Sequence, residues 1–119
     1  PYMVFGTPGG DQQDQWTLQF FLNVVEFGMD LQEAIDAPTF HSTHFPSSFY
    51  PHGAHPGGLH LEARMPIDVR VELAAKGHTV NVDGEWSHGR VLAATMNEET
   101  GVLSAAASPR GETAYAMGW

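Results

Sequence analysis

The sequence predicts an α+β fold, organised as one domain or as one piece of a domain, and three observations support this. Short β-favouring runs alternate with segments that have the hydrophobic periodicity of helices. Clusters of glycine and proline separate these segments, and two apolar runs near the end form a hairpin pattern. The expected order is strand, helix, helix, loop, strand, helix and three strands, which is typical of α+β proteins.

The first expected elements are a strand and a helix. Residues 2–5 are apolar and β-favouring, and they stop at the glycine- and proline-rich run 6–10. Residues 11–28 are expected to form a helix whose apolar residues spread around most of its surface, leaving one polar stripe of Gln19, Asn23 and Glu26. Such a helix must be covered on more than one side, so we expect a further chain segment or a partner subunit to pack on it.

The second helix is expected to be short. Asp30 and Glu33 have the spacing of a capping box, and Pro38 stops a helix that ends at Asp36 or Ala37. Residues 41–58 are dense in His, Pro, Ser and Gly and are expected to form one long loop, and loops of this length are usually functional or packed against something.

The second half is expected to hold strands 59–62 and 78–82 with a helix between them. Pro66 and Gly77 suit the two ends of that helix, whose buried face we expect to comprise Ile67, Val71 and Ala74. The hairpin strands are residues 89–96 and 102–107, joined by the five-residue loop 97–101.

The composition excludes several classes of function. Five Lys and Arg residues against 14 Asp and Glu residues give a net charge of −9, so we expect no binding to nucleic acid. The chain lacks Cys, which excludes disulfides and thiolate metal sites. No apolar run approaches the roughly 20 residues of a membrane span, and no signal-peptide pattern opens the chain. The first residue is Pro, and we expect a processed or excised piece of a longer protein, whose compartment stays open.

The run Gly6-Thr7-Pro8-Gly9-Gly10 is the first candidate for chemistry. It lies between a strand and a helix, where consecutive backbone N–H groups favour an anion. The functional interpretation is an oxyanion hole, since a phosphate-binding loop would need a Walker or G-x-G-x-x-G pattern. The alternative is a tight turn with no chemical role.

Histidines, hydroxyls and one arginine are further candidates. His41-x-x-His44 and His52-x-x-His55 can share a metal on a turn, although a polar, exposed loop explains them equally simply. Ser42, Ser47, Ser48, Thr7 and Thr39 are nucleophiles by residue type only, because no G-x-S-x-G elbow is present. Arg110 is expected either to orient a substrate carboxylate or to tie the tail to a buried Asp.

Several stretches together resemble the γ-glutamyltranspeptidase family. They are Gly6-Thr7-Pro8-Gly9-Gly10 with the helix after it, the run from Phe27 to Pro38, and Phe40-His41. Further along, the run from Leu73 to Val80 and Ser108-Pro109-Arg110-Gly111 fit the C-terminal part of the family in the same order. The first block is specific, and the later blocks reinforce it, so the resemblance spans nearly all 119 residues.

The resemblance implies an N-terminal-nucleophile hydrolase with a four-layer αββα sandwich, of which residues 1–119 form the C-terminal portion of the small subunit, an incomplete domain. Such enzymes cut themselves into a large and a small subunit. The new N-terminal Thr attacks a γ-glutamyl amide, and water or an amino acid then accepts the acyl group. The resemblance puts this nucleophile upstream rather than at Thr7. It assigns the oxyanion hole to the backbone N–H groups of Gly9 and Gly10.

The partners follow from the same resemblance. We expect the remainder of the small subunit, the large subunit and a γ-glutamyl small molecule, no cofactor or metal, and an inactive chain in isolation; the oligomeric state stays open. Thr39 stands where the family often has Arg, and Ser108 where it often has Asp, so other acyl amides, including a β-lactam side chain, also stay open. The alternative is a non-enzymatic, His-rich metal-binding or interaction domain.

Overall fold

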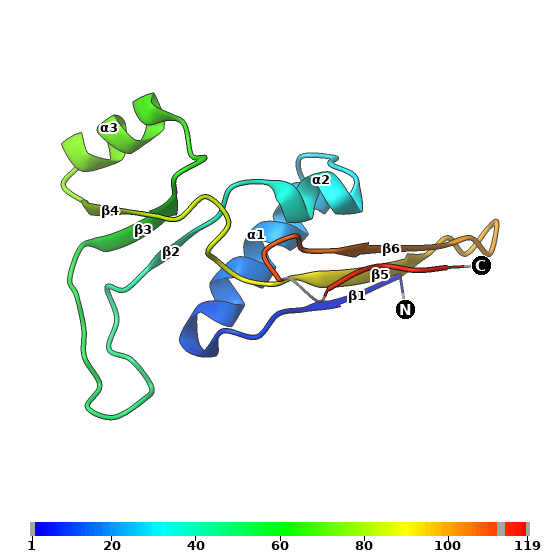
Figure 1. The fold of residues 1–119 in the computed structure, drawn as a ribbon, viewed down its shortest axis with the longest axis horizontal. Helices are drawn as coiled ribbons and strands as arrows, with labels where there is room; N and C mark the ends of the chain where they lie inside the picture. Colours follow the sequence, from blue (N-terminus) through cyan, green and yellow to red (C-terminus); the bar gives the residue numbers. More distant parts are fainter. Residues whose placement is uncertain (1, 112–113, 119) are drawn as a thin grey trace.

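The computed structural model describes residues 2–111 and 114–118, and it contains two three-stranded sheets with helices between and beside them (Figure 1). The mixed α+β class is confirmed. The elements are β1 (Met3–Gly6), the 3-10 helix η1 (Gly10–Gln12), α1 (Gln13–Val25), α2 (Leu31–Asp36), β2 (Phe40–Ser42), β3 (Gly58–Glu62), α3 (Ile67–Ala75), β4 (Thr79–Asp83), β5 (Leu92–Met96) and β6 (Leu103–Ala107).

The first sheet is antiparallel, in the order β1-β5-β6, and α1 and α2 cover one of its faces. The core lies in this layer, where Phe20 of α1 and Ile35 of α2 are 2% exposed and pack with the small residues Ala93 and Ala106 of the sheet. The opposite face carries exposed apolar side chains, namely those of Val4, Leu92, Met96 and Leu103. One face of the sheet is therefore sealed, and the other presents an apolar surface.

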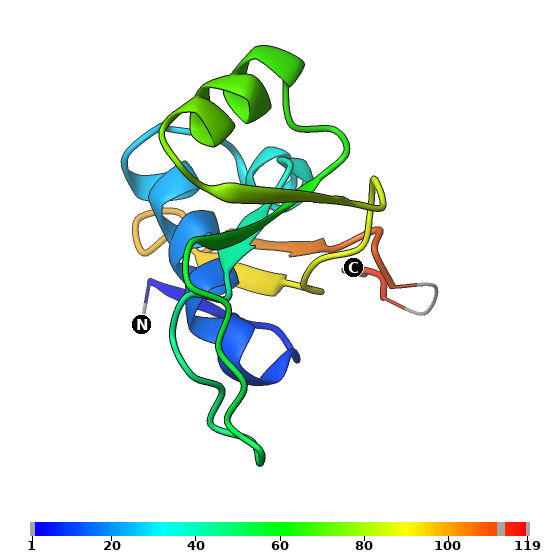
Figure 2. The ribbon, with the colours of Figure 1, turned by 90° about the vertical axis from the view of Figure 1, so that its left-hand side faces the viewer.

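The second sheet has the order β2-β3-β4, with β2 antiparallel and β4 parallel to the central strand β3. The parallel pair is joined by α3, which lies beside the sheet (Figure 2). Both Leu59 and Leu61 of β3 are buried. This sheet carries the residues that surround the start of α1.

The polar stripe of α1 attaches the helix to this second sheet. The side-chain amide of Gln19 donates to the Phe40 carbonyl at 2.8 Å and accepts from the Phe40 N–H at 3.1 Å. Gln15 forms the same pair of bonds with Ser42, at 3.0 and 2.8 Å. Gln19 of the polar stripe and Gln15, one turn before it, thus bond to the edge of β2 much as a neighbouring strand would.

The predicted elements are largely present, with three differences in extent. The expected helix 11–28 is divided into η1 and the shorter α1, β2 lies within what was expected to be loop, and β5 begins at Leu92. The short strand β2 was missed because its pairing with β3 is set by residues 17 to 21 positions away. The capping box of α2 is confirmed, because Asp30 and Glu33 each accept the other's backbone N–H.

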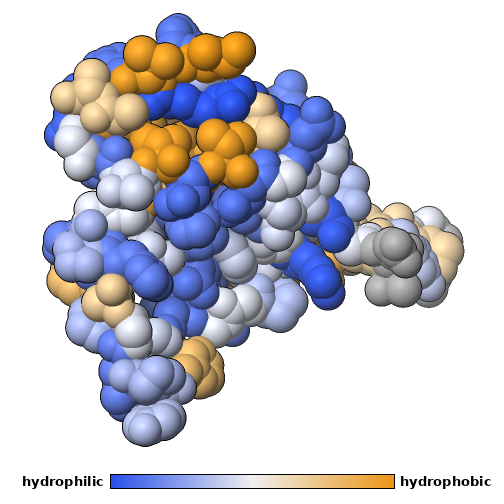
Figure 3. Space-filling view, turned by 60° about the vertical axis from the view of Figure 1, so that its left-hand side comes forward, coloured by the Kyte–Doolittle hydropathy of each residue, from blue (hydrophilic) through white to orange (hydrophobic). Residues whose placement is uncertain are grey.

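The predicted buried face of α3 is wrong. Ile67 is 72% exposed and Val71 63% exposed, and none of the residues of α3 is fully buried. Among the described elements, α3 packs chiefly on β4, so its apolar side chains lie at the molecular surface with those of the neighbouring strand (Figure 3). In the same range of described residues, no helix is long and apolar enough to cross a membrane.

Candidate functional site

The loop that joins β1 to α1 has a backbone conformation that favours glycine. Gly9 has φ 144° and ψ 15°, and Gly10 has φ 59°, both in the region that L side chains rarely adopt. Side chains also close around both positions. A Cβ atom on Gly9 would collide with the ring of Trp16, and one on Gly10 would lie 3.1 Å from Cε2 of Phe49. Position 9 therefore favours glycine for both conformation and space, and position 10 favours it for conformation, with little room for a Cβ atom.

The N–H groups of these two glycines are available to an incoming group. Within the described parts of the chain, neither N–H donates a hydrogen bond to another residue. Gly9 also borders a hollow of about 420 Å³, which is lined by Pro8, Gly9, Trp16, Trp86, Ser87, Gly89, Arg90 and Arg110. Two neighbouring donors at the start of a helical segment, beside an open hollow, can hold a negatively charged oxygen.

Thr7 fixes the beginning of this loop. Its Oγ1 accepts a hydrogen bond of 2.6 Å from the N–H of Arg90 and donates one of 2.9 Å to the carbonyl of Pro8. The hydroxyl is thereby used in backbone contacts between the loop and the segment before β5. This agrees with a positioning role for Thr7 rather than a nucleophilic one.

Three histidines and Asp83 gather around Trp16. His60 Nδ1 and His88 Nε2 lie 3.0 and 2.8 Å from the same Oδ2 of Asp83, which can only accept from the two rings. His41 stacks on His60 with ring centroids 4.9 Å apart. The indole of Trp16 lies nearly parallel to His88 at 5.8 Å and edge-on to His41 at 5.4 Å. The aromatic side chain that touches Gly9 is thus held by this cluster.

The surroundings within the cluster lower the pKa of two of its members, His41 and Asp83. Burial lowers the pKa of His41 to about 4, with further contributions from His88 and His60, so the ring is neutral at pH 7. Burial alone would raise the pKa of Asp83, but hydrogen bonds from His88 and His60 outweigh it and hold this pKa below its usual range. A neutral His41 can stack closely on its neighbours without repulsion between charges.

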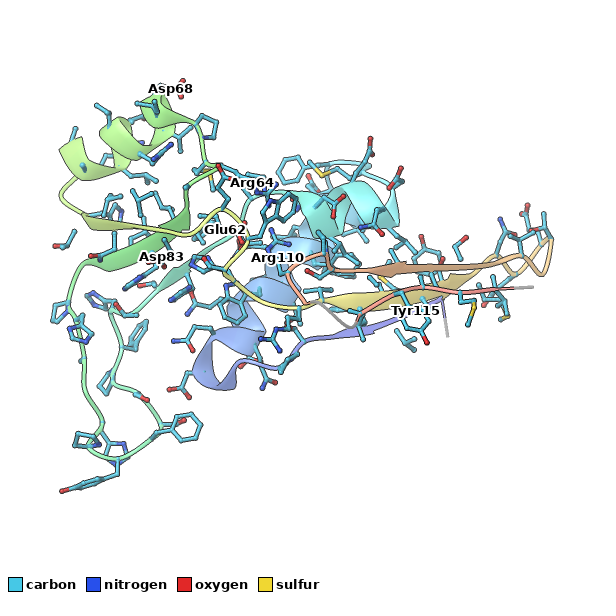
Figure 4. The ribbon with its side chains drawn as sticks, viewed as in Figure 1. Glu62, Arg64, Asp68, Asp83, Arg110 and Tyr115 are labelled. Atoms are coloured by element: carbon cyan, nitrogen blue, oxygen red, sulfur yellow. The ribbon has the colours of Figure 1, made fainter. Side chains whose placement is uncertain are left out.

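Glu62 at the end of β3 is a second centre of organisation. It is fully buried, and Arg110 donates to both of its oxygens, from Nε to Oε1 at 2.6 Å and from the second guanidinium nitrogen to Oε2 at 2.7 Å. Arg64 adds a bond of 3.0 Å, and Figure 4 shows these three side chains together between the two sheets. Burial would raise the pKa of Glu62, but Arg110 and the N–H groups of His88 and Thr39 lower it. The predicted tie of Arg110 to a buried acid is confirmed, with Glu rather than Asp as the acid.

The histidine pairs expected to share a metal are used in other ways. His44 Nδ1 accepts from the N–H of Gly57 at 3.0 Å, and His52 Nδ1 lies 2.8 Å from the carbonyl of Ser47. Among the described residues, no group of three or more His, Asp or Glu side chains is arranged to hold a metal ion. The metal-binding alternative is therefore not favoured.

The candidate hydroxyls also lack the partner that nucleophilic catalysis needs. Ser47 and Ser48 donate to the carboxylate of Asp11, and Ser42 donates to the carbonyl of Gly58. In the portion of the chain that the structure describes, none of these hydroxyls bonds to a histidine ring. The candidate hydroxyls that the structure describes therefore form no nucleophile and base pair with a histidine.

Sequence reasoning identified the glycines but missed the residues that hold them. Trp16 was counted only as one apolar residue of a helix, and His88, Asp83 and Glu62 were given no role. The members of these clusters come from α1, β2, β3, β4 and the segment before β5, so their spacing along the chain carries no signal. A buried acid at the end of an apolar strand, such as Glu62, was the one feature that could have indicated a paired centre.

Comparison with known proteins identifies relatives of this chain. The family model described as Gamma-glutamyltranspeptidase matches residues 1–118. A curated relative, the glutathione hydrolase-like YwrD proenzyme of Bacillus subtilis, is 30% identical over 96% of this chain and 21% of its own length.

Two solved structures extend the comparison. The structure of LmbA2991HD is 54% identical, with a TM-score of 0.94 over 100% of this chain and 21% of that chain. The cephalosporin acylase from Bacillus halodurans is 27% identical, with a TM-score of 0.78 over 97% and 20% of the two chains.

The chain thus spans about a fifth of the length of these three relatives, and the likeness covers nearly all of it. Its structural neighbours are N-terminal-nucleophile hydrolases, and its α+β fold matches one part of their fold. On the match over residues 1–118, the chain belongs to the gamma-glutamyltranspeptidase family.

Proposed function

We propose that this chain supplies the oxyanion-hole loop of an enzyme that cleaves γ-glutamyl or related acyl amides through an N-terminal Thr. The observation that carries the proposal is the pair of free N–H groups at Gly9 and Gly10, both held at positive φ, with a side chain close to each position. Membership of the family supports the reaction class.

In the proposed reaction, the Thr hydroxyl, which lies outside this chain, attacks the amide carbonyl carbon. The carbonyl oxygen takes up the electron pair and becomes an oxyanion, which accepts hydrogen bonds from the N–H groups of Gly9 and Gly10. Collapse of this intermediate breaks the C–N bond, the nitrogen takes up the proton given up by the Thr hydroxyl, and the amine leaves behind an ester between the acyl group and Thr. Water or an amine then attacks the ester through a second oxyanion at the same two N–H groups, the C–O bond to Thr breaks, and the attacking group gives up a proton that restores the Thr hydroxyl.

The remainder of the same precursor is the proposed partner of this chain. The outer face of the β1-β5-β6 sheet exposes Val4, Leu92, Met96 and Leu103, and an apolar sheet face of this kind is normally buried against another layer. We infer that residues 1–119 are the C-terminal portion of the small subunit and that a second sheet of the precursor covers this face. The isolated chain is accordingly inactive.

The acyl donor is proposed to be a γ-glutamyl amide. The curated relative is called a glutathione hydrolase-like proenzyme, which supports this donor, whereas one of the solved neighbours is a cephalosporin acylase. A β-lactam side-chain amide is therefore the second donor to assay. Both acyl donors would present a planar amide carbonyl to the N–H groups of Gly9 and Gly10.

The deciding test compares Gly10→Ala with Gly101→Ala in a family-length precursor that carries this chain. Gly101 has φ 72° and nothing within 4 Å of an added Cβ, so it reproduces the backbone strain away from the loop. We expect Gly10→Ala to reduce kcat/KM for a γ-glutamyl anilide by about 10²- to 10³-fold. Gly101→Ala should retain kcat/KM while losing about 1 kcal/mol of stability.

Two further measurements complete the test. Intact-mass analysis during turnover should show one acyl group on the fragment that begins with Thr. Turnover by the isolated 119-residue chain, or equal kcat/KM in the two glycine variants, would contradict the proposed role.

A further inference from the structure

The loop formed by residues 43–57, here called the aromatic loop, has a defined structure of its own. The N–H of Ser47 donates to the carbonyl of Gly53 at 2.9 Å, and the N–H of His52 donates to the carbonyl of Phe49 at 2.7 Å. At the base of the loop, the backbone N–H of His55 donates to the carbonyl of Thr43 at 2.9 Å. The loop descends beside the N-terminal end of α1 in both ribbon views (Figures 1 and 2).

Asp11 fastens the aromatic loop to the start of the helical segment. Its carboxylate accepts from Ser47 Oγ at 2.7 Å, from the Ser48 N–H at 2.9 Å and from the Ser48 hydroxyl. The hydrogen bonds from Ser48 and Ser47 lower the pKa of Asp11, so the carboxylate stays charged and the attachment persists at neutral pH. Asp11 directly follows Gly10, and the attachment therefore sets the position of the loop relative to the proposed oxyanion donors.

The attachment brings one aromatic ring to the reacting centre. Phe49 lies against Gly10, with its Cε2 3.1 Å from the site that a Cβ would occupy, and the ring is 64% exposed. The ring therefore lies beside the glycine whose N–H would hold the oxyanion, and most of its surface remains exposed. Tyr50, the next residue, is 92% exposed and serves as a comparison.

We propose that Phe49 is a specificity-determining residue that forms an apolar wall for the amine part of the acyl donor. This inference rests on the proposed function, because it takes Gly10 as a donor to the substrate oxyanion. A γ-glutamyl group carries a carboxylate and an ammonium group, which need polar partners that a phenyl ring lacks. The amine part is the remaining substituent of the amide carbonyl, and an aromatic or apolar amine gains contact area on such a wall.

The test measures Phe49→Ala in the family-length enzyme with two donors that share one acyl group, γ-glutamyl anilide and γ-glutamyl methylamide. Both donors give the same acyl-enzyme, so they differ only in the binding of the amine part and in the step that expels it. We expect Phe49→Ala to lower kcat/KM for the anilide about tenfold, while kcat/KM for the methylamide changes less than twofold. The Phe49→Tyr variant, which keeps an aromatic ring, should retain the preference for the anilide.

Two variants separate the wall from a general effect on the loop. Ser48→Ala weakens the attachment to Asp11 and should reduce the anilide preference, whereas Tyr50→Ala should leave it unchanged. An equal loss for both donors in Phe49→Ala, or defective autoprocessing as its main effect, would overturn the inference and indicate a contact with the rest of the precursor. If the unaltered enzyme turns over neither donor, the proposed function itself fails, which is a distinct outcome.

Discussion

Arg110 and Glu62 form a two-point ion pair that connects the turn after β6 to the end of β3. The guanidinium is 3% exposed and the carboxylate is fully buried, and the bonds measure 2.6 and 2.7 Å. Arg110 also donates to the carbonyls of Ile35 and Ala37, at 2.6 and 2.8 Å, which satisfies the end of α2. The pair therefore joins both sheets and the second helix in one network.

The first prediction concerns Arg110→Lys. Lysine cannot make the two parallel bonds to Glu62 or reach both carbonyls, so a buried carboxylate is left incompletely paired. We expect a loss of about 3–5 kcal/mol in the free energy of unfolding, measured by chemical denaturation. Lys76→Ala is the control, because its pair with Glu72 is exposed and is worth at most about 0.5 kcal/mol. Similar losses in both variants would show that burial of the pair is unimportant.

The second prediction concerns the attachment of α1 to β2. Gln19→Ala leaves the N–H and carbonyl of Phe40 without their partner, and we expect a loss of about 1–2 kcal/mol in unfolding free energy. Hydrogen exchange at the Phe40 amide should accelerate in the same variant. The control is Gln13→Ala, an exposed glutamine at the start of the same helix. Unchanged exchange at Phe40 would mean that the amide bonds do not hold this edge.

The third prediction is a dependence of stability on pH that originates at His41. Its pKa is about 4 when folded and near 6.5 when unfolded, so between these values the unfolded state binds more protons. Stability should therefore fall as the pH drops from 6.5 to 4. We expect a loss of roughly 2 kcal/mol after allowing for solvent screening at this half-buried ring.

The His41→Phe variant isolates that effect. It keeps an aromatic ring beside Trp16 and His60 while removing the titrating group, so the slope of unfolding free energy against pH should become shallower in this range. His78→Phe, at an exposed position, should retain the original slope. The idea fails if both variants show the same pH dependence as the unaltered protein.

Much of the fold could be predicted because its signals are local. The capping box of Asp30 and Glu33, the glycine-rich loop and the final hairpin each depend on residues within a few positions of one another. Within the candidate site, only the glycines were predictable, because a glycine- and proline-rich run between a strand and a helix is a local signal. The side chains that hold them, such as Trp16 and Asp83, meet through tertiary packing, and no periodicity or spacing along the chain encodes that meeting.

The burial of one face of α3 was predicted wrongly for a different reason. Apolar spacing in this helix predicted a buried side, and among the described elements α3 packs chiefly on β4. The same holds for the apolar residues of α1 that stay exposed, such as Leu18 and Val25. Periodicity reports that a face is apolar, and whether that face is covered depends on what packs against it.

The last prediction tests whether Trp16 holds Gly9 in place. A Cβ on Gly9 would collide with the benzo ring of Trp16, so Gly9→Ala should be strongly destabilising, and part of the cost should disappear when Trp16 is replaced by Leu. We expect a coupling energy of about 1–2 kcal/mol from a double-mutant cycle of unfolding free energies, with a residual cost from the positive φ. Gly101→Ala combined with Trp16→Leu is the matched cycle, and its coupling should be near zero because Gly101 has open space around it. Additive losses at Gly9 would show that the indole does not determine where the proposed oxyanion donor lies.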